Sequence, residues 1–121
     1  MGNVASVLNI SRFIGGDARI STSPDEVRDA STLILPGVGA FDAGIRALRE
    51  TGMDSAIDEA VSDCDATLLG ICLGMQLLFE VGTEDGEHRG LGLLGGRVER
   101  FAFGPEQASQ RLRVPHMGWN Q

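Results

Sequence analysis

A cysteine lies between two glycines in the stretch Gly70-Ile71-Cys72-Leu73-Gly74. The pattern Gly-x-Cys-x-Gly is the thiol counterpart of the nucleophile elbow Gly-x-Ser-x-Gly, in which a nucleophile stands on a sharp turn between a strand and a helix. Side chains two residues before and after the nucleophile would collide in such a turn, so glycine is expected at both places. The pattern therefore predicts that Cys72 is a nucleophile.

The residues around this turn decide between a nucleophile and a small buried cysteine, which is the usual role of such a pattern on its own. An elbow needs a strand before it and a helix after it, and the apolar positions in 66–71 and 73–81 predict both. The helix would point its first amides at the sulfur, which favours the thiolate, and the amide of Leu73 would face an oxyanion. Cys64 instead falls on the apolar stripe of a predicted helix, so we expect it to pack in the core.

A second glycine turn follows another predicted strand. The apolar run 32–35 ends in Pro36-Gly37-Val38-Gly39, which we expect neither to continue the strand nor to start a helix. In a parallel sheet this turn would open on the same edge as Cys72, where ligands of α/β proteins bind. Its glycines could let backbone amides face a substrate, but a plain glycine turn fits the pattern equally well.

The rest of the chain alternates between helical and strand patterns. Ser23-Pro24-Asp25-Glu26 has the form of a helix start with a capping box, and Gly52 is a predicted helix stop. The predicted helices are 4–14, one beginning at 23, 42–50, 55–64 and 73–81, and the predicted strands are 18–21, 32–35, 66–71, 97–103 and 112–115. Apolar runs such as 32–35 are expected to be buried on both faces of the sheet. This alternation predicts an α/β fold with a parallel sheet, and 121 residues suffice for one domain.

The composition excludes several classes of function. The net charge is −7, and no cluster of Lys and Arg suggests a site for nucleic acid or for an anionic membrane surface. Two cysteines and two histidines without zinc-site spacing predict no metal site, and we expect no cofactor. No signal peptide is visible and the apolar runs are too short to span a bilayer, so a cytoplasmic protein is expected.

Other candidate motifs carry less weight. The stretch 90–95 matches the dinucleotide pattern Gly-x-Gly-x-x-Gly, but it precedes a predicted strand where a helix is required, so we interpret it as a chance match. His88 lies in a predicted polar loop over 83–89 and is expected to be solvated. His116 is the nearby candidate for a base to Cys72, although its neighbours favour a packed surface.

Three segments together resemble the glutaminase subunits of imidazole glycerol phosphate synthase: Leu33–Phe41, Gly70–Leu78 and Pro115–Asn120. The cysteine turn alone fits any class I (triad) glutamine amidotransferase, and the other two segments narrow the resemblance to this histidine-biosynthesis family. The resemblance implies a Cys-His-Glu triad on a flavodoxin-like parallel sheet with flanking helices. It also implies that glutamine is hydrolysed through a cysteine thioester and that ammonia passes to a cyclase (synthase) subunit. That partner makes imidazole glycerol phosphate and aminoimidazole carboxamide ribonucleotide.

The resemblance implies roles for individual residues. It makes Cys72 the catalytic nucleophile and gives the two amides of the oxyanion hole to Val38 and Leu73. The residues matching positions that hold the glutamine substrate are Gly37, Gly39, Gln76 and Glu84. The segment Pro115-His116-Met117-Gly118-Trp119-Asn120 is expected to face the synthase subunit, because Trp and Met are favoured at interface centres. Ordinary packing of its tryptophan within the domain is the alternative.

The chain departs from the family pattern at both ends. Met1-Gly2-Asn3 matches a Met-Gly-Asn that follows the first strand in the family, and the family's catalytic His and Glu lie beyond the last residue. We therefore expect 1–121 to be a partial glutamine amidotransferase domain that is inactive and poorly soluble or partly disordered when made alone. Two alternatives stay open: another class I amidotransferase with a different acceptor, or a non-catalytic α/β binding module that keeps the elbow as scaffold.

Overall fold

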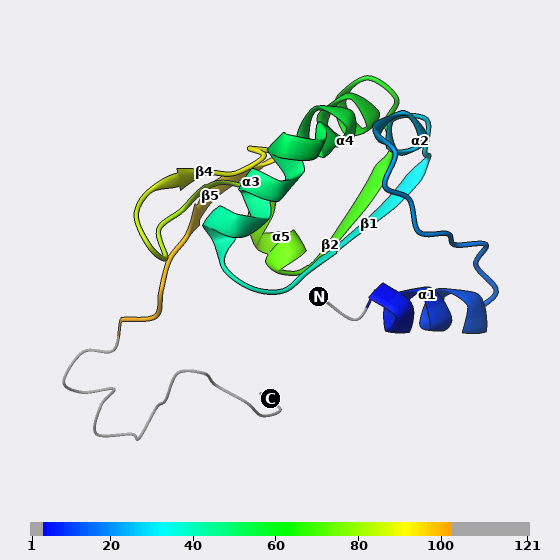
Figure 1. Cartoon of the computed structure of the whole chain (residues 1–121), viewed down its shortest axis with the longest axis horizontal. Coiled ribbons are helices and arrows are strands. Elements are labelled where there is room, and N and C mark those ends of the chain that lie inside the picture. Colours follow the sequence, from blue (N-terminus) through cyan, green and yellow to red (C-terminus); the bar gives the residue numbers. More distant parts are fainter. Residues whose placement is uncertain (1–3, 103–121) are drawn as a thin grey trace.

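The computed structural model describes residues 4–102 as five helices and five strands (Figure 1). The predicted strand 112–115 and the predicted interface 115–120 lie outside these residues. In chain order the elements are α1 (Val4–Phe13), α2 (Pro24–Arg28), β1 (Thr32–Gly37), α3 (Phe41–Thr51), α4 (Met53–Ser62), β2 (Thr67–Cys72), α5 (Leu73–Leu77), β3 (Phe79–Gly82), β4 (His88–Arg89) and β5 (Leu94–Val98).

The strands β1 and β2 pair in parallel, with Thr32 opposite Thr67 and Gly37 opposite Cys72. The predicted α/β fold with a parallel sheet and flanking helices is thus confirmed. β1 continues two residues beyond the predicted 32–35, through Pro36 and Gly37, so the prediction that these two residues cannot continue the strand is wrong. A proline is tolerated there because β1 is an edge strand in the described part of the chain, so no ladder bond to a further strand is lost.

A second small sheet follows α5. Its central strand β3 pairs with β4 in antiparallel and with β5 in parallel orientation. The predicted helix 73–81 is therefore wrong beyond Leu77. The helix stops because the carbonyls of Leu77 and Leu78 accept hydrogen bonds from the amides of Leu91 and Leu94, at 2.8 and 2.9 Å, instead of continuing the helical ladder.

Helices α3 and α4 follow each other with Gly52 alone between them. Gly52 has φ 71° and both ends α3 and begins α4, so the predicted stop is confirmed, and α4 begins two residues before the predicted Ser55. α4 buries Ala56, Ile57 and Ala60. Its last residue is Ser62, which leaves Cys64 exposed after the helix; the predicted core position of Cys64 is wrong.

Helix α2 begins as predicted after Ser23, but the Ser23 side chain makes no capping bond. The predicted capping box is therefore wrong: the Ser21 hydroxyl donates to the Glu26 carboxylate and accepts a bond from the Ser23 amide, which the Glu26 side chain would accept in a capping box. Arg28 at the end of α2 donates to Glu59 on α4, and this bond is the main cause that raises the pKa of Arg28, with a bond to Asp25 second. The contact ties α2 to α4.

One face of the β1–β2 sheet is uncovered in the described part of the chain. Ile34, Leu69 and Ile71 are 38%, 54% and 37% exposed, so the predicted burial on both faces is wrong for these residues. Helix α1 follows its predicted bounds to within a residue but buries none of its side chains. Figure 1 shows it joined to α2 by an extended segment in which residues 18–21 form no strand, contrary to prediction, because a strand needs a neighbour to pair with.

Candidate active site at the ends of β1 and β2

Cys72 stands on a sharp turn between a strand and a helix. It is the last residue of β2, and Leu73 is the first residue of α5. The backbone of Cys72 has φ 55° and ψ −120°, a region that non-glycine residues seldom occupy and that costs about 1–3 kcal/mol. The free thiol is exposed among the residues described. The turn therefore presents the sulfur at the surface and does not bury it as a small core residue.

The two flanking glycines are required by close backbone contacts. A Cβ atom on Gly70 would lie 2.5 Å from Cα and 2.7 Å from the amide nitrogen of Met75. A Cβ atom on Gly74 would lie 1.8 Å from the carbonyl oxygen of Leu35. The predicted collisions are confirmed, and they have different partners. Gly70 lets β2 approach its own helix, whereas Gly74 lets that helix approach the neighbouring strand β1.

The second glycine turn touches the first. Gly37 is the register partner of Cys72, and a Cβ atom on Gly37 would lie 2.9 Å from the amide nitrogen of Gly74 and 3.0 Å from Cβ of Leu73. Both turns therefore open on one edge of the parallel sheet, as the sequence predicts. Val38 is exposed, and Gly39 has φ 106° with no atom near its missing side chain. The loop 38–40 thus runs along open space beside the cysteine.

The remaining predicted site residues are more scattered. Gln76 lies on α5, half-buried and one turn beyond the cysteine, so it shares the elbow's helix. Glu84 lies exposed in the turn between β3 and β4. His88 belongs to β4 and not to a loop, and its Nε2 lies 3.0 Å from the Asp85 carbonyl oxygen. His116 lies outside the described residues.

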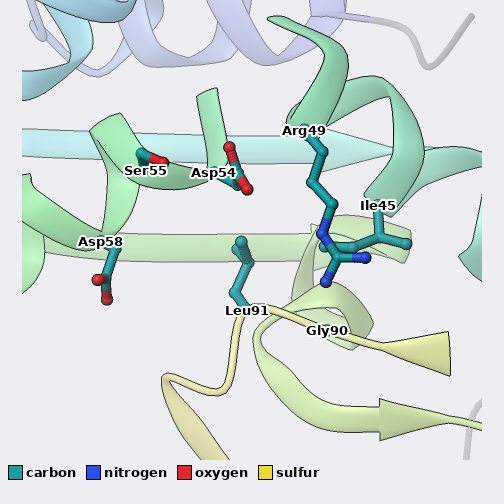
Figure 2. A pocket seen from close by; sticks show the side chains of 7 residues that line it. All are labelled: Ile45, Arg49, Asp54, Ser55, Asp58, Gly90 and Leu91. Atoms are coloured by element: carbon teal, nitrogen blue, oxygen red, sulfur yellow. The ribbon is translucent and has the colours of Figure 1, made fainter. Parts of the chain in front are cut away.

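The stretch 90–95 follows β4 and runs into β5, so a strand stands where a dinucleotide site requires a helix. Its first two residues line a hollow of about 160 Å³ between α3 and α4 (Figure 2). The lining residues are Ile45, Arg49, Asp54, Ser55, Asp58, Gly90 and Leu91. Arg49 is engaged there, because its guanidinium donates to the Arg89 carbonyl at 3.0 Å. The hollow contains no predicted site residue and is smaller than usual ligand pockets, which hold about 300–1,000 Å³.

The described residues hold no group of three or more His, Cys, Asp or Glu side chains that could bind a metal ion. They also contain no helix long and apolar enough to cross a membrane. Sequence reasoning missed the buried ring that directly follows the loop 38–40 and the two glycines that make room for it. These are Phe41, Gly82 and Gly90, and only Phe41 carried a signal, as the last residue of a segment shared with the resembled family.

The family model of CobB/CobQ-like glutamine amidotransferase domains matches residues 14–103. The match includes both glycine turns and the cysteine between β2 and α5. The chain belongs to this glutamine amidotransferase family. Cys72 lies inside the matched segment, on a strand-to-helix turn of the nucleophile-elbow type.

Three curated relatives of this amidotransferase chain are named imidazole glycerol phosphate synthase subunit HisH, or HisH 2 in Methanococcus maripaludis. The relative from Streptococcus gordonii is 51% identical over 98% of this chain and 55% of its own length. Those from Sulfurimonas denitrificans and Methanococcus maripaludis are 50% and 42% identical, over 100% and 99% of this chain and 57% and 56% of their own lengths. The chain spans about half the length of the curated relatives it matches.

Proposed function

We propose that the protein is the glutaminase subunit of an imidazole glycerol phosphate synthase and acts in the cytoplasm. The observation that carries the proposal is the strained, exposed Cys72 on an elbow whose neighbouring strand ends in a second glycine turn. The thiolate would add to the side-chain amide carbon of glutamine, and the tetrahedral intermediate would expel ammonia to leave a thioester. Water would then cleave the thioester to glutamate and free the thiolate.

The oxyanion of that intermediate is assigned to the amides of Val38 and Leu73. Leu73 supports this assignment because it is the first residue of α5, and amides of a first helical turn have no partner within the helix. The residue as a whole is 4% exposed, so packing in the core fixes its position at the start of α5. The contact between Gly37 and the Leu73–Gly74 backbone brings the loop with Val38 alongside.

Glutamine itself would be held by Gly37, Gly39, Gln76 and Glu84. Gly39 suits a close approach of substrate to backbone, since space beside it is open. A base must take the thiol proton and later protonate the leaving ammonia. His88 already faces a carbonyl oxygen on its own turn, so we assign the base and its orienting carboxylate to residues outside 4–102.

Ammonia would pass to a cyclase subunit, which makes imidazole glycerol phosphate and aminoimidazole carboxamide ribonucleotide. The names of the relatives support this partner, since each is a subunit of that synthase. The segment 115–120, with Met117 and Trp119, would face it. A second candidate, an amidotransferase with another acceptor, is favoured by the name of the matching family model, which refers to CobB and CobQ. The strain at Cys72 argues against a non-catalytic scaffold.

Selective alkylation tests this proposal, because the chain contains an internal control. Cys64 and Cys72 are both free and exposed, yet only Cys72 lies at the elbow. A chloroketone that mimics glutamine should modify Cys72 and spare Cys64 in the full-length protein, and added glutamine should protect Cys72. A small neutral reagent such as iodoacetamide should show less preference. Equal labelling of the two cysteines by the chloroketone, without protection by glutamine, would contradict a glutamine site.

A further inference from the structure

Phe41 is the largest fully buried side chain among residues 4–102, with 1% of its surface exposed. It is the first residue of α3 and directly follows the loop 38–40. Its ring belongs to a buried cluster with Ile45, Leu73 and Leu77. The most deeply buried large side chain therefore lies immediately after the loop that carries a proposed oxyanion amide.

Two glycines make room for the Phe41 ring. A Cβ atom on Gly82 of β3 would lie 2.5 Å from Cγ of Phe41, and one on Gly90 would lie 3.1 Å from its Cζ. Real Cβ atoms essentially never approach a neighbour as closely as the first distance. The ring is thus seated against the backbone of the second sheet, which leaves it little freedom to shift.

Leu73 connects this seat to the elbow. Its Cβ lies 3.0 Å from the position of a Cβ on Gly37, and its Cδ2 lies 3.1 Å from that of Gly44 in the first turn of α3. The loop 38–40 is therefore held at both ends. At Gly37 it is held by strand pairing and by Leu73, and at Phe41 by the buried ring. Between the two anchors, Gly39 lies in open space.

We propose that Phe41 is a positioning residue for the glutaminase reaction, holding the amide of Val38 in register with the amide of Leu73. This inference rests on the proposed function. Phe41 is buried and does not reach substrate, so it acts through the geometry of the oxyanion hole. Donors of an oxyanion hole act when they are already aimed at the developing charge, and misplacement by about 1 Å can lower a rate about 100-fold. The effect should therefore fall chiefly on kcat, because the substrate contacts assigned to Gln76 and Glu84 lie outside this loop.

The test compares Phe41→Leu and the longer, more flexible Phe41→Met with Ile45→Val in the full-length protein and its synthase partner. Ile45 is 3% exposed in the same cluster, one helical turn farther from the loop, so it reports loss of packing alone. Each variant is assayed for kcat and KM with glutamine and for unfolding in urea. Active sites are counted by labelling Cys72 to completion with the chloroketone that mimics glutamine. Per counted site, kcat should fall about 10- to 100-fold in Phe41→Leu and less in Phe41→Met, with KM changed by less than about twofold.

Ile45→Val should lose stability but keep the wild-type kcat per counted site. If Phe41→Leu does not fold, Phe41→Met decides in its place. Should the Phe41 variants retain wild-type kcat per site, or fall only as far as Ile45→Val, the inference is overturned while the proposed function stands. A wild-type protein that shows no Cys72-dependent glutamine turnover would overturn the proposed function itself, before any variant is compared.

Discussion

Replacing Gly74 by alanine tests the interlocked turns most sharply. The new Cβ would lie 1.8 Å from the Leu35 carbonyl oxygen, where real Cβ contacts are essentially never under 3.0 Å, so β1 and α5 must separate by about 1 Å. The two nearest atoms, the carbonyl oxygen and the carbonyl carbon of Leu35, belong to the backbone and cannot rotate away. Overpacking of this kind usually costs about 1–3 kcal/mol, and we expect the upper end, about 3 kcal/mol. The same displacement at the elbow should lower glutaminase kcat about 100-fold.

Gly95→Ala is the matched control, because no atom lies within 4 Å of its missing Cβ and its φ is not in the left-handed region. Urea unfolding of the two full-length variants gives both free energies of unfolding, with the slope against urea checked for two-state behaviour. Gly95→Ala should stay within about 0.5 kcal/mol of the wild type. If Gly74→Ala unfolds at the same urea concentration as Gly95→Ala and keeps its activity, the close packing of α5 on β1 is refuted.

Three further outcomes are expected. Gly39→Ala should lower glutamine-dependent kcat at least about tenfold, because φ 106° is strained for alanine. Activity of the synthase with free ammonia should stay unchanged. An unchanged glutamine-dependent kcat would mean that the loop 38–40 is not part of the oxyanion site. Trp119→Ala should weaken binding of the synthase subunit by about 2 kcal/mol, measured by calorimetry, and uncouple glutamine hydrolysis from product; unchanged affinity and coupling would refute the interface. The 121-residue chain alone should release no more glutamate from glutamine than a Cys72→Ala control, and turnover above that control would make His116 the first candidate for the base.

The Cys72 turn could be predicted from the sequence because its requirements are local. A nucleophile on a strand-to-helix turn leaves no space for side chains two residues away, so Gly70 and Gly74 report the geometry directly. The parallel pairing of β1 with β2 followed from two apolar runs of strand length separated by helical patterns. The shared edge of the two glycine turns then follows from strand direction alone.

The end of α5 could not be predicted, because distant residues decide it. Apolar residues at 73, 77, 78 and 81 suit a helix, while the alternation around Phe79 and Val81 suits a strand. Carbonyl groups at the end of α5 accept hydrogen bonds from the amides of residues 91 and 94, more than ten positions away. These bonds end the helix and decide in favour of a strand. The role of Phe41 was hidden for the same reason, since its seat is formed by Gly82 and Gly90 from separate parts of the second sheet. The strand predicted at 18–21 failed because apolar content alone does not supply a pairing partner.

The central claim is that Cys72 is the nucleophile of a glutaminase, and Cys72→Ser in the full-length protein tests it most directly. Serine keeps the shape of the side chain with a slightly smaller atom in place of sulfur, but its hydroxyl is hardly ionised at neutral pH and is a far weaker nucleophile without its own base. Glutamine-dependent synthesis by the variant with its synthase partner should fall to background, while synthesis from free ammonia and the free energy of unfolding stay at wild-type values. Cys64→Ser should behave as wild type in both assays. Glutamine-dependent turnover that survives in Cys72→Ser would contradict the account.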